Sequence, residues 1–330
     1  MNWFDMSVAD VAPITISSLP VAGIALAIVA AALLAVGNEF QARGISKVSA
    51  KVDEPAALGM RQFRRLFKSG VWLLGTLSLG LSVLVQLASL TLAPLIVVQP
   101  VGVVALVFAA LLTAWATHRL PSRRVVRSIL ICVGGVAVFV TVAALVAQQH
   151  PIQDAELIAI LVVLGVVLLA LGGSFVYFLR FSPRRAVPPI FFVLAGGALT
   201  GFVATLGKTV ILRVQTVLES PAFMVDSATI LTGACVLGLL VAGGLSIYFV
   251  QMSHTGNRPE VVVAGLTVID PFVAVILGVT ILGEAAGAPW WALILFVLAG
   301  GVAVAGVFLL SAAQQKDERL AVAASDASGA

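Results

Sequence analysis

One charged side chain stands in the middle of a long apolar run in the second half of the chain. Asp270 lies within the run Val261–Ile281 and is followed directly by Pro271. A proline inside a helix has no N–H to donate, so the carbonyl of Thr267 loses its helical partner. A carboxylate, a threonine and an unpaired carbonyl within one turn are suited to holding a cation or a proton. We therefore predict that Asp270 and Thr267 bind a substrate or ion and that Pro271 is a kink or hinge; an Asp270 bonded structurally to a neighbouring helix is the alternative.

A lysine in another apolar run has two opposed interpretations. Lys208 lies near the end of the run Pro189–Leu212. A lysine at that depth can extend its ammonium to the headgroups while its stem stays in the apolar region. It can equally belong to a site, where it would pair with an acidic substrate or with Asp270. Both interpretations stay open from the sequence.

Boundary carboxylates give weaker candidates. Glu39 lies near the end of the run Val21–Phe40, with Asn38 beside it, and we predict that both contribute to substrate or ion binding. A carboxylate at the end of an apolar run is also an ordinary feature, and we interpret Glu284 in that way. If the bound species is a metal ion, Asp270 and Glu39 are the predicted ligands, because carboxylate oxygens suit hard cations such as Mg²⁺.

Two glutamines and a second proline complete the candidates. Gln86 and Gln251 are predicted to contact substrate, although interhelical hydrogen bonds explain amide side chains equally well. Pro100 interrupts another apolar run and frees the carbonyl of Ile96, so it is predicted to be a hinge or a kink.

The composition of the chain indicates whether these residues lie in a water-soluble protein or in a membrane protein. The chain has 330 residues, of which 61% are hydrophobic and 10% charged, and its mean hydropathy is +1.13. Soluble domains are about 45–50% apolar and about 25% charged, so a water-soluble protein is excluded. Disorder and a disulfide framework are also excluded, the latter because there are only two cysteines. A charge near the bilayer centre costs about 2.5–3.5 kcal/mol on insertion scales, which makes the few that occur there functional candidates.

Apolar runs long enough to cross a bilayer occur nine times. About 20 residues of helix span the hydrocarbon, and only helices or closed barrels satisfy the backbone there. The predicted fold is therefore an all-α integral membrane protein with nine transmembrane helices. We place them at Val21–Phe40, Gly70–Leu90, Ala93–Ala116, Val126–Ala147, Leu157–Leu179, Pro189–Leu212, Ala228–Val250, Val261–Ile281 and Trp290–Leu310.

The basic residues predict the orientation of these helices. All but two of the 19 Lys and Arg residues lie in alternate loops and in the C-terminal tail; the exceptions are Lys208 and Arg213. Cytoplasmic loops carry the excess of Lys and Arg, so the N-terminus is predicted outside and the C-terminus inside. This distribution also removes the need for a nucleic-acid partner. We expect a multi-pass protein of a cell membrane, such as a bacterial cytoplasmic membrane.

The two halves of the chain share a pattern. The segment Val85–Val98 matches Val250–Val263 with the same spacing from glutamine to proline, and Gly134–Val138 recurs at Gly300–Val304. Five predicted helices separate the matched segments, so equivalent helices cross the membrane in opposite directions. Inverted repeats are typical of secondary transporters, whose substrate site lies near the midplane between the halves; chance matches of abundant small residues are the alternative.

The repeat divides the chain into five parts. Residues 1–20 form an extracytoplasmic segment, 21–147 the first repeat, 148–187 the fifth helix with its loops, 188–311 the inverted second repeat, and 312–330 a disordered cytoplasmic tail.

Several of these segments resemble the drug/metabolite transporter superfamily, and most closely its NIPA branch, which is named for magnesium transport. The resemblance covers residues 21–310 and implies a transporter built from inverted repeats. It is carried by Gly37, Phe40, Arg43–Gly44, Trp72, Gly75, the run Leu92–Gly102, Gly197, Thr200, Lys208 and the run Thr267–Glu284.

The sequence thus predicts a secondary transporter that moves a small metabolite, drug or lipid-linked compound by alternating access. A magnesium transporter is the alternative, ranked second because only Asp270 is a carboxylate near the midplane. A non-transporting scaffold for envelope enzymes is the third interpretation. We expect no enzymatic activity and no cofactor; the expected partners are the lipid bilayer and a small-molecule or ion substrate, and a homodimer is left open.

Overall fold

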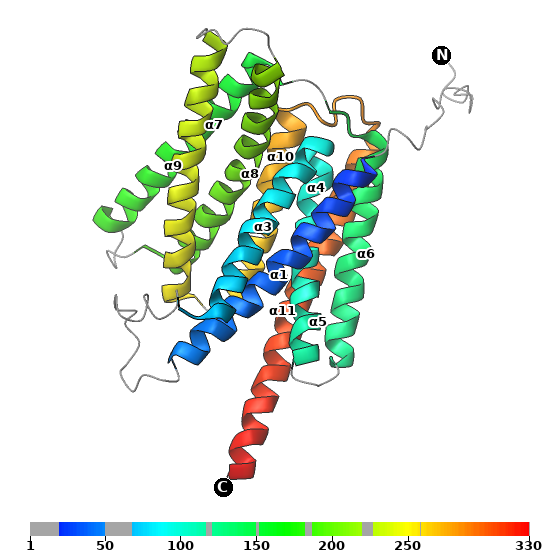
Figure 1. Cartoon of the computed structure of the whole chain (residues 1–330), viewed down its shortest axis with the longest axis vertical. Coiled ribbons are helices and arrows are strands. Elements are labelled where there is room, and N and C mark those ends of the chain that lie inside the picture. The colour runs from blue at the N-terminus through cyan, green and yellow to red at the C-terminus, as the bar shows by residue number, and fades with distance from the viewer. Residues whose placement is uncertain are drawn as a thin grey trace, which may run out of the picture.

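A computed structural model describes residues 20–49, 68–116, 121–149, 152–181, 187–219, 227–257 and 259–329. Within those ranges the backbone is helical with short connections and no strand (Figure 1). All but the last residue of the predicted N-terminal segment, and several of the basic loop residues that predict the orientation, lie outside the described ranges.

The helices follow the apolar runs closely. Nine stretches of the described chain are long and apolar enough to span a membrane, which confirms the predicted number. One of the nine is formed by two consecutive helices, α4 and α5. The bounds are α1 Val21–Ser49, α3 Gly70–Leu92, α4 Leu95–Gly102, α5 Val104–Ala116, α6 Arg123–Val146, α7 Asp154–Phe181, α8 Pro189–Glu219, α9 Ser227–Gly256, α10 Pro259–Thr280 and α11 Trp290–Gly329.

Prolines set the break between α3 and α4. Ala93 is extended, with φ −143° and ψ 154°, as the residue before a proline is expected to be. Pro94 then caps α4, and its carbonyl accepts from the N–H groups of Val97 and Val98. The two amides that precede them, those of Leu95 and Ile96, have no partner inside their own helix, as is usual at a helix start.

The other two prolines that the sequence singles out behave differently. Pro100 lies inside α4, which ends two residues later, and the N–H of Val103 donates back to the Pro100 carbonyl at 3.2 Å. The apolar run is therefore interrupted near Pro100. Pro271 lies inside α10, which continues without a break to Thr280.

Glycines allow several helix pairs to approach closely. A Cβ added at Gly75 of α3 would lie 2.9 Å from the Gly37 carbonyl oxygen of α1, and one at Gly201 of α8 would lie 2.8 Å from Cβ of Val273 on α10. α6 packs on α11 in the same manner, where a Cβ at Gly306 would meet the backbone of Cys132 at 2.5 Å. Small residues are the usual means by which membrane helices pack, since lipid tails provide no hydrophobic driving force between them.

The outer surface of the described helices is apolar. Leu169 of α7 is 77% exposed and Leu240 of α9 is 67% exposed. Trp290 begins α11 and Trp115 lies at the end of α5; both are largely exposed, as tryptophans of an interfacial belt are. A surface of this kind is stable only against hydrocarbon, which supports a multi-pass membrane protein. Cys132 and Cys235 are free and buried, so no disulfide joins them.

We name the two ends of the bundle by residues. The Arg43 end holds the last turns of α1, α5 and α7 and the first turns of α3, α6, α8 and α10; the Glu284 end is the opposite one (Figure 1). α11 runs toward the Arg43 end and projects beyond the other helices (Figure 1). The disordered tail predicted from residue 312 differs from the structure, which continues the helix to Gly329. The segment is rich in alanine, the residue with the highest helix propensity.

Replacing Gly201 by leucine is expected to separate α8 from α10. The added side chain would collide with Val273 and with the Asp270 carbonyl oxygen, 2.9 Å from the new Cβ. Overpacking of this kind costs about 1–3 kcal/mol of unfolding free energy. Thermal unfolding in detergent should show a lower Tm for Gly201→Leu. Gly172→Leu is the matched control, because nothing lies within 4 Å of a Cβ at Gly172; equal loss of Tm in both variants would contradict the packing argument.

Candidate functional site

A cavity of about 640 Å³ lies between two groups of helices. One wall is formed by α1, α3, α4 and α5, and the other by α8, α10 and one residue of α9. The lining runs from Leu90 and Ala204 toward Asn38, Ala109 and Val263, so the cavity extends from mid-bundle toward the Arg43 end.

The cavity wall is mainly apolar with a small set of polar groups. Most lining residues are Ala, Val, Leu and Gly, which suits an organic body rather than a fully hydrated ion. The polar lining residues are Asn38, Ser82, Gln86, Gln99, Thr200, Thr267 and Asp270. Asp270 is the only one of the lining residues that carries a charge.

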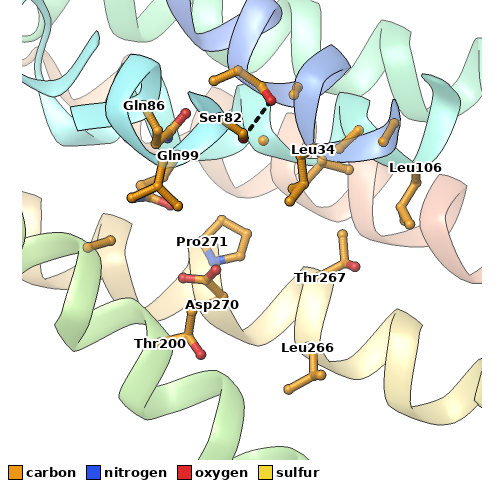
Figure 2. A pocket seen from close by; sticks show the side chains of 18 of the residues that line it. Leu34, Ser82, Gln86, Gln99, Leu106, Thr200, Leu266, Thr267, Asp270 and Pro271 are labelled. Atoms are coloured by element: carbon orange, nitrogen blue, oxygen red, sulfur yellow. Dashed lines mark hydrogen bonds between the residues drawn. The ribbon is translucent and has the colours of Figure 1, made fainter. Parts of the chain in front are cut away.

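Asp270 has an unpaired oxygen. Its Oδ1 atom is inaccessible to solvent and has no hydrogen-bond partner within the described ranges. In Figure 2 the carboxylate lies in the space between α10, which carries it, and the helix that carries Gln86. The close packing of α8 on α10 through Gly197 and Gly201 holds this stretch of α10 in place. A buried carboxylate without a partner is costly, so this group is suited to receive a proton or a cation.

The neighbouring hydroxyl groups are already engaged as donors. Thr267 Oγ1 donates to the Val263 carbonyl at 2.7 Å, and Thr200 Oγ1 donates to the Gly196 carbonyl at 2.8 Å. Thr200 also shares a hydrogen bond of 2.8 Å with Ser246 of α9. Each hydroxyl therefore faces the cavity mainly as an acceptor.

The lining amides are not engaged. The side-chain amides of Asn38, Gln86 and Gln99 form no hydrogen bond with the described part of the chain. Gln86 and Gln99 lie on the wall that faces Asp270 (Figure 2). Each amide offers two N–H donors and one carbonyl acceptor, so the wall can bind both kinds of polar group on a solute.

A second polar cluster lies outside the cavity, at the Glu284 end. The Lys208 ammonium of α8 is 2.6 Å from Oε1 of Glu284, and the two side chains are only 1% and 3% exposed. Lys208 Nζ also donates to the Ala93 carbonyl at 3.3 Å. Snorkelling to the surface is therefore excluded for Lys208, which pairs with Glu284 rather than with Asp270.

Glu284 also closes the start of α4. The N–H of Leu95 donates to Glu284 Oε1 at 2.7 Å, and that of Ile96 donates to Oε2 at 2.8 Å. A carboxylate at a helix N-terminus satisfies otherwise unpaired amides and complements the helix dipole. Glu284 is thus a buried connector between segments, which differs from its interpretation as a boundary residue.

The local backbone around Glu284 makes this position available. Gly283 has φ +62°, a left-handed conformation that glycine adopts at no steric cost. Gly278 leaves room for the carboxylate, since a Cβ there would lie 3.0 Å from Glu284 Oε2. The Glu284 carbonyl accepts from the N–H of Gln148 at 2.8 Å, which joins the end of α6 to the same point.

The structure brings together some of the predicted site residues and separates others. Those that line the cavity are Asn38, Gln86, Thr267, Asp270 and Pro271. The predicted residues absent from its lining are Glu39, Pro100, Lys208 and Gln251.

Besides Lys208, the structure places three of the predicted residues outside the cavity lining. Glu39 pairs with Arg43 one turn along α1 at 2.7 Å, and the two side chains are partly exposed. Gln251 is exposed on α9, and Pro100 is buried within α4. Glu39 therefore does not share the cavity with Asp270, and the described residues contain no cluster of three His, Cys, Asp or Glu side chains.

Sequence reasoning missed several lining residues. Gln99 and Thr200 lie on the cavity walls, as does Ser82, whose hydroxyl donates to the Ala30 carbonyl at 2.8 Å (Figure 2). Gln99 precedes Pro100 in an otherwise apolar run, and that isolation is a signal that could have identified it.

No protein-family model, curated protein sequence or solved structure matches this chain. The features of the chain that bear on function are therefore the cavity and the two buried carboxylates, Asp270 with an unpaired oxygen and Glu284 paired.

Glu284→Ala is expected to destabilise the protein strongly. It would leave Lys208 as a buried charge without its carboxylate, and it would leave the amides of Leu95 and Ile96 without an acceptor. Removing one partner of a buried ion pair costs about 3–5 kcal/mol of unfolding free energy. Glu39→Ala is the control, since its partly exposed pair with Arg43 should contribute only about 0.3–0.5 kcal/mol. Thermal unfolding in detergent compares the two; a Tm for Glu284→Ala as high as that of Glu39→Ala would contradict the contacts described.

Proposed function

We propose that this protein is a secondary transporter of the drug/metabolite type, which moves a small organic solute across a cell membrane by alternating access. The observation that carries the proposal is the cavity between two groups of helices, with the unpaired Asp270 in its wall. A cavity at mid-bundle between two halves is where such transporters bind substrate.

The helix arrangement supports the inverted repeat. Pro94 and Pro259, which correspond in the sequence match, both stand where a new helix begins. The pair α1 and α3 in the first half corresponds to α8 and α9 in the second, and both pairs pack closely. The matched glycine pairs at Gly134 and Gly300 lie on α6 and α11, which also pack on each other. Equivalent helices run in opposite directions in the bundle, as inversion requires (Figure 1).

The basic residues support an orientation. Arg43, Lys68, Arg123 and Arg180, among others, lie at or near helix termini of the Arg43 end. By the positive-inside rule this end faces the cytoplasm. In that orientation the cavity extends toward the cytoplasm.

The charge of the lining favours a basic or neutral solute over an acidic one. Asp270 is the only charged lining residue, and two basic residues outside the lining are paired with other carboxylates: Lys208 with Glu284, and Arg43 with Glu39. An ammonium group would pair with Asp270, while Gln86 and Gln99 supply hydrogen bonds to a polar part. Without such a solute, Asp270 would take a proton, which provides a route to coupling with a proton gradient.

Magnesium transport fits the cavity less well. Mg²⁺ is held by oxygen ligands, often one or two carboxylates with several retained waters. The cavity supplies one carboxylate, and Glu39 is not in its lining. The flux experiment below distinguishes the proposed transporter from a Mg²⁺ transporter and from a non-transporting scaffold.

The first step of the test identifies a solute. Metabolite, lipid and Mg²⁺ content are compared between cells that lack the protein and cells that contain it. Solutes that differ are then assayed for uptake into proteoliposomes under an imposed proton gradient, with a trapped Mg²⁺ indicator in a parallel set. Flux of Mg²⁺ alone would identify the protein as a magnesium transporter and refute the organic substrate. The absence of any flux would favour the non-transporting scaffold.

Asp270→Asn is expected to abolish gradient-driven flux of the identified solute. The amide keeps the size of the side chain but can neither pair with an ammonium nor exchange a proton. Asp317→Asn is the matched control, because Asp317 lies in the last third of α11 and outside the cavity. Wild-type flux in a folded Asp270→Asn variant would remove Asp270 from the mechanism.

A further inference from the structure

We infer that Lys208, Glu284 and the first turn of α4 form a gate that closes the cavity at the Glu284 end. The inference rests on the proposed function, since a gate has a role only if the cavity must open alternately to both sides. It assigns the cluster outside the cavity a role in transport beyond holding the fold together.

The contacts of this cluster join the two halves of the bundle. Lys208 and Glu284 come from the second half, while Ala93, Leu95 and Ile96 come from the first. Four polar contacts meet at the two charged side chains, with lengths between 2.6 and 3.3 Å. The only one of these contacts that lies within one half is the ion pair itself.

The cluster lies directly beyond the cavity. Ala204 of α8 lines the cavity, and Lys208 follows it by one helical turn. Leu90 of α3 also lines the cavity, and Ala93 follows it within a turn. None of the residues in the cluster lines the cavity, so the cluster lies between the cavity lining and the Glu284 end.

Tight packing of small residues completes the seal. A Cβ added at Gly23 of α1 would lie 2.4 Å from Cβ of Ala93. The hydroxyl of Ser89 donates to the Gly23 carbonyl at 2.7 Å, which joins α1 and α3 within the first half. The first half therefore presents a compact surface to Glu284, and the crossing contacts to Lys208 and Glu284 are polar.

The polar contacts between the two halves can break and re-form as the proposed gate opens and closes. A buried ion pair contributes little net stability, because the loss of hydration offsets most of the attraction between the charges. When the halves separate, water reaches Lys208, Glu284 and the amides of α4 and replaces the lost contacts. The closed and open states can then be close in free energy, as alternating access requires.

Thiol labelling tests the gate through water access. The reporter is Ala204→Cys, placed in the cavity wall, in a background where Cys132 and Cys235 are replaced by alanine. A membrane-impermeant maleimide is applied to vesicles of each orientation, with the accessibility of a C-terminal tag identifying the Arg43 end. With the gate residues intact, labelling is expected mainly from the Arg43 end.

Glu284→Gln and Lys208→Met should each raise the labelling rate from the Glu284 end. An increase of about tenfold is expected, since that needs a shift of only about 1.4 kcal/mol between closed and open states. Glu156→Gln is the matched control, a glutamate at the same end that bonds only within the start of α7. Unchanged labelling from the Glu284 end in both folded gate variants would overturn the inference.

Hydrogen exchange of the unmodified protein covers the case in which neither variant folds. A gate opens repeatedly, so the amides of Leu95 and Ile96 should exchange faster than those of the closely packed stretch around Val136 in α6. Equal and strong protection of both segments would identify the cluster as a permanent staple and overturn the gate.

The two proposals can fail separately. Labelling reports access of water and needs no substrate, whereas flux reports transport. Gate-dependent labelling in a protein without any flux would refute the proposed function and keep the gate. Asp270-dependent flux with labelling that is insensitive to Glu284 and Lys208 would refute the gate alone.

Discussion

The carboxylate of Glu284 holds together segments that are far apart in the sequence. It accepts from the Leu95 and Ile96 amides and pairs with the Lys208 ammonium. The break at Pro94 leaves those amides without helical partners, and in the closed arrangement both residues are fully buried, so the carboxylate takes the place of water. The positions of α4, α8 and the segment after α10 at this end therefore depend on one another through a single side chain.

The carboxylates of Glu284 and Asp270 have opposite surroundings. The difference indicates a structural role for Glu284 and a binding role for Asp270. Every polar demand of Glu284 is met inside the protein. Asp270 keeps an oxygen that no described residue satisfies, and it faces a cavity in which no lining residue is basic. Glu284, whose hydrogen-bonding capacity is satisfied without a ligand, stabilises the closed arrangement. Asp270 is not satisfied, so a bound ligand or proton would gain the most interaction energy there.

Much of the fold could be predicted because hydrocarbon thickness imposes helix length. The nine spans follow from that constraint, and so does the choice of Asp270 as a candidate, because it is an isolated ionisable residue within one of them. The partner of Lys208 could not be predicted, because Glu284 lies 76 residues away and the amides that it caps lie nearly 190 residues before it. Gln99 and Thr200 were missed because which face of a helix meets the cavity is decided by packing between helices. Glu39 is predicted as a ligand from its carboxylate and from the polar residue Asn38 beside it, whereas in the structure it pairs with Arg43 on its own helix.

The two faces of α8 carry separate constraints. Gly197 and Gly201 face α10 so closely that a larger side chain has no room, while Thr200, Val203 and Ala204 face the cavity. Substitutions on the cavity face can change its shape and polarity without moving the helix that carries Asp270. Changes in the shape and polarity of the cavity are therefore expected to arise by single cavity-facing substitutions, with the glycine face held fixed.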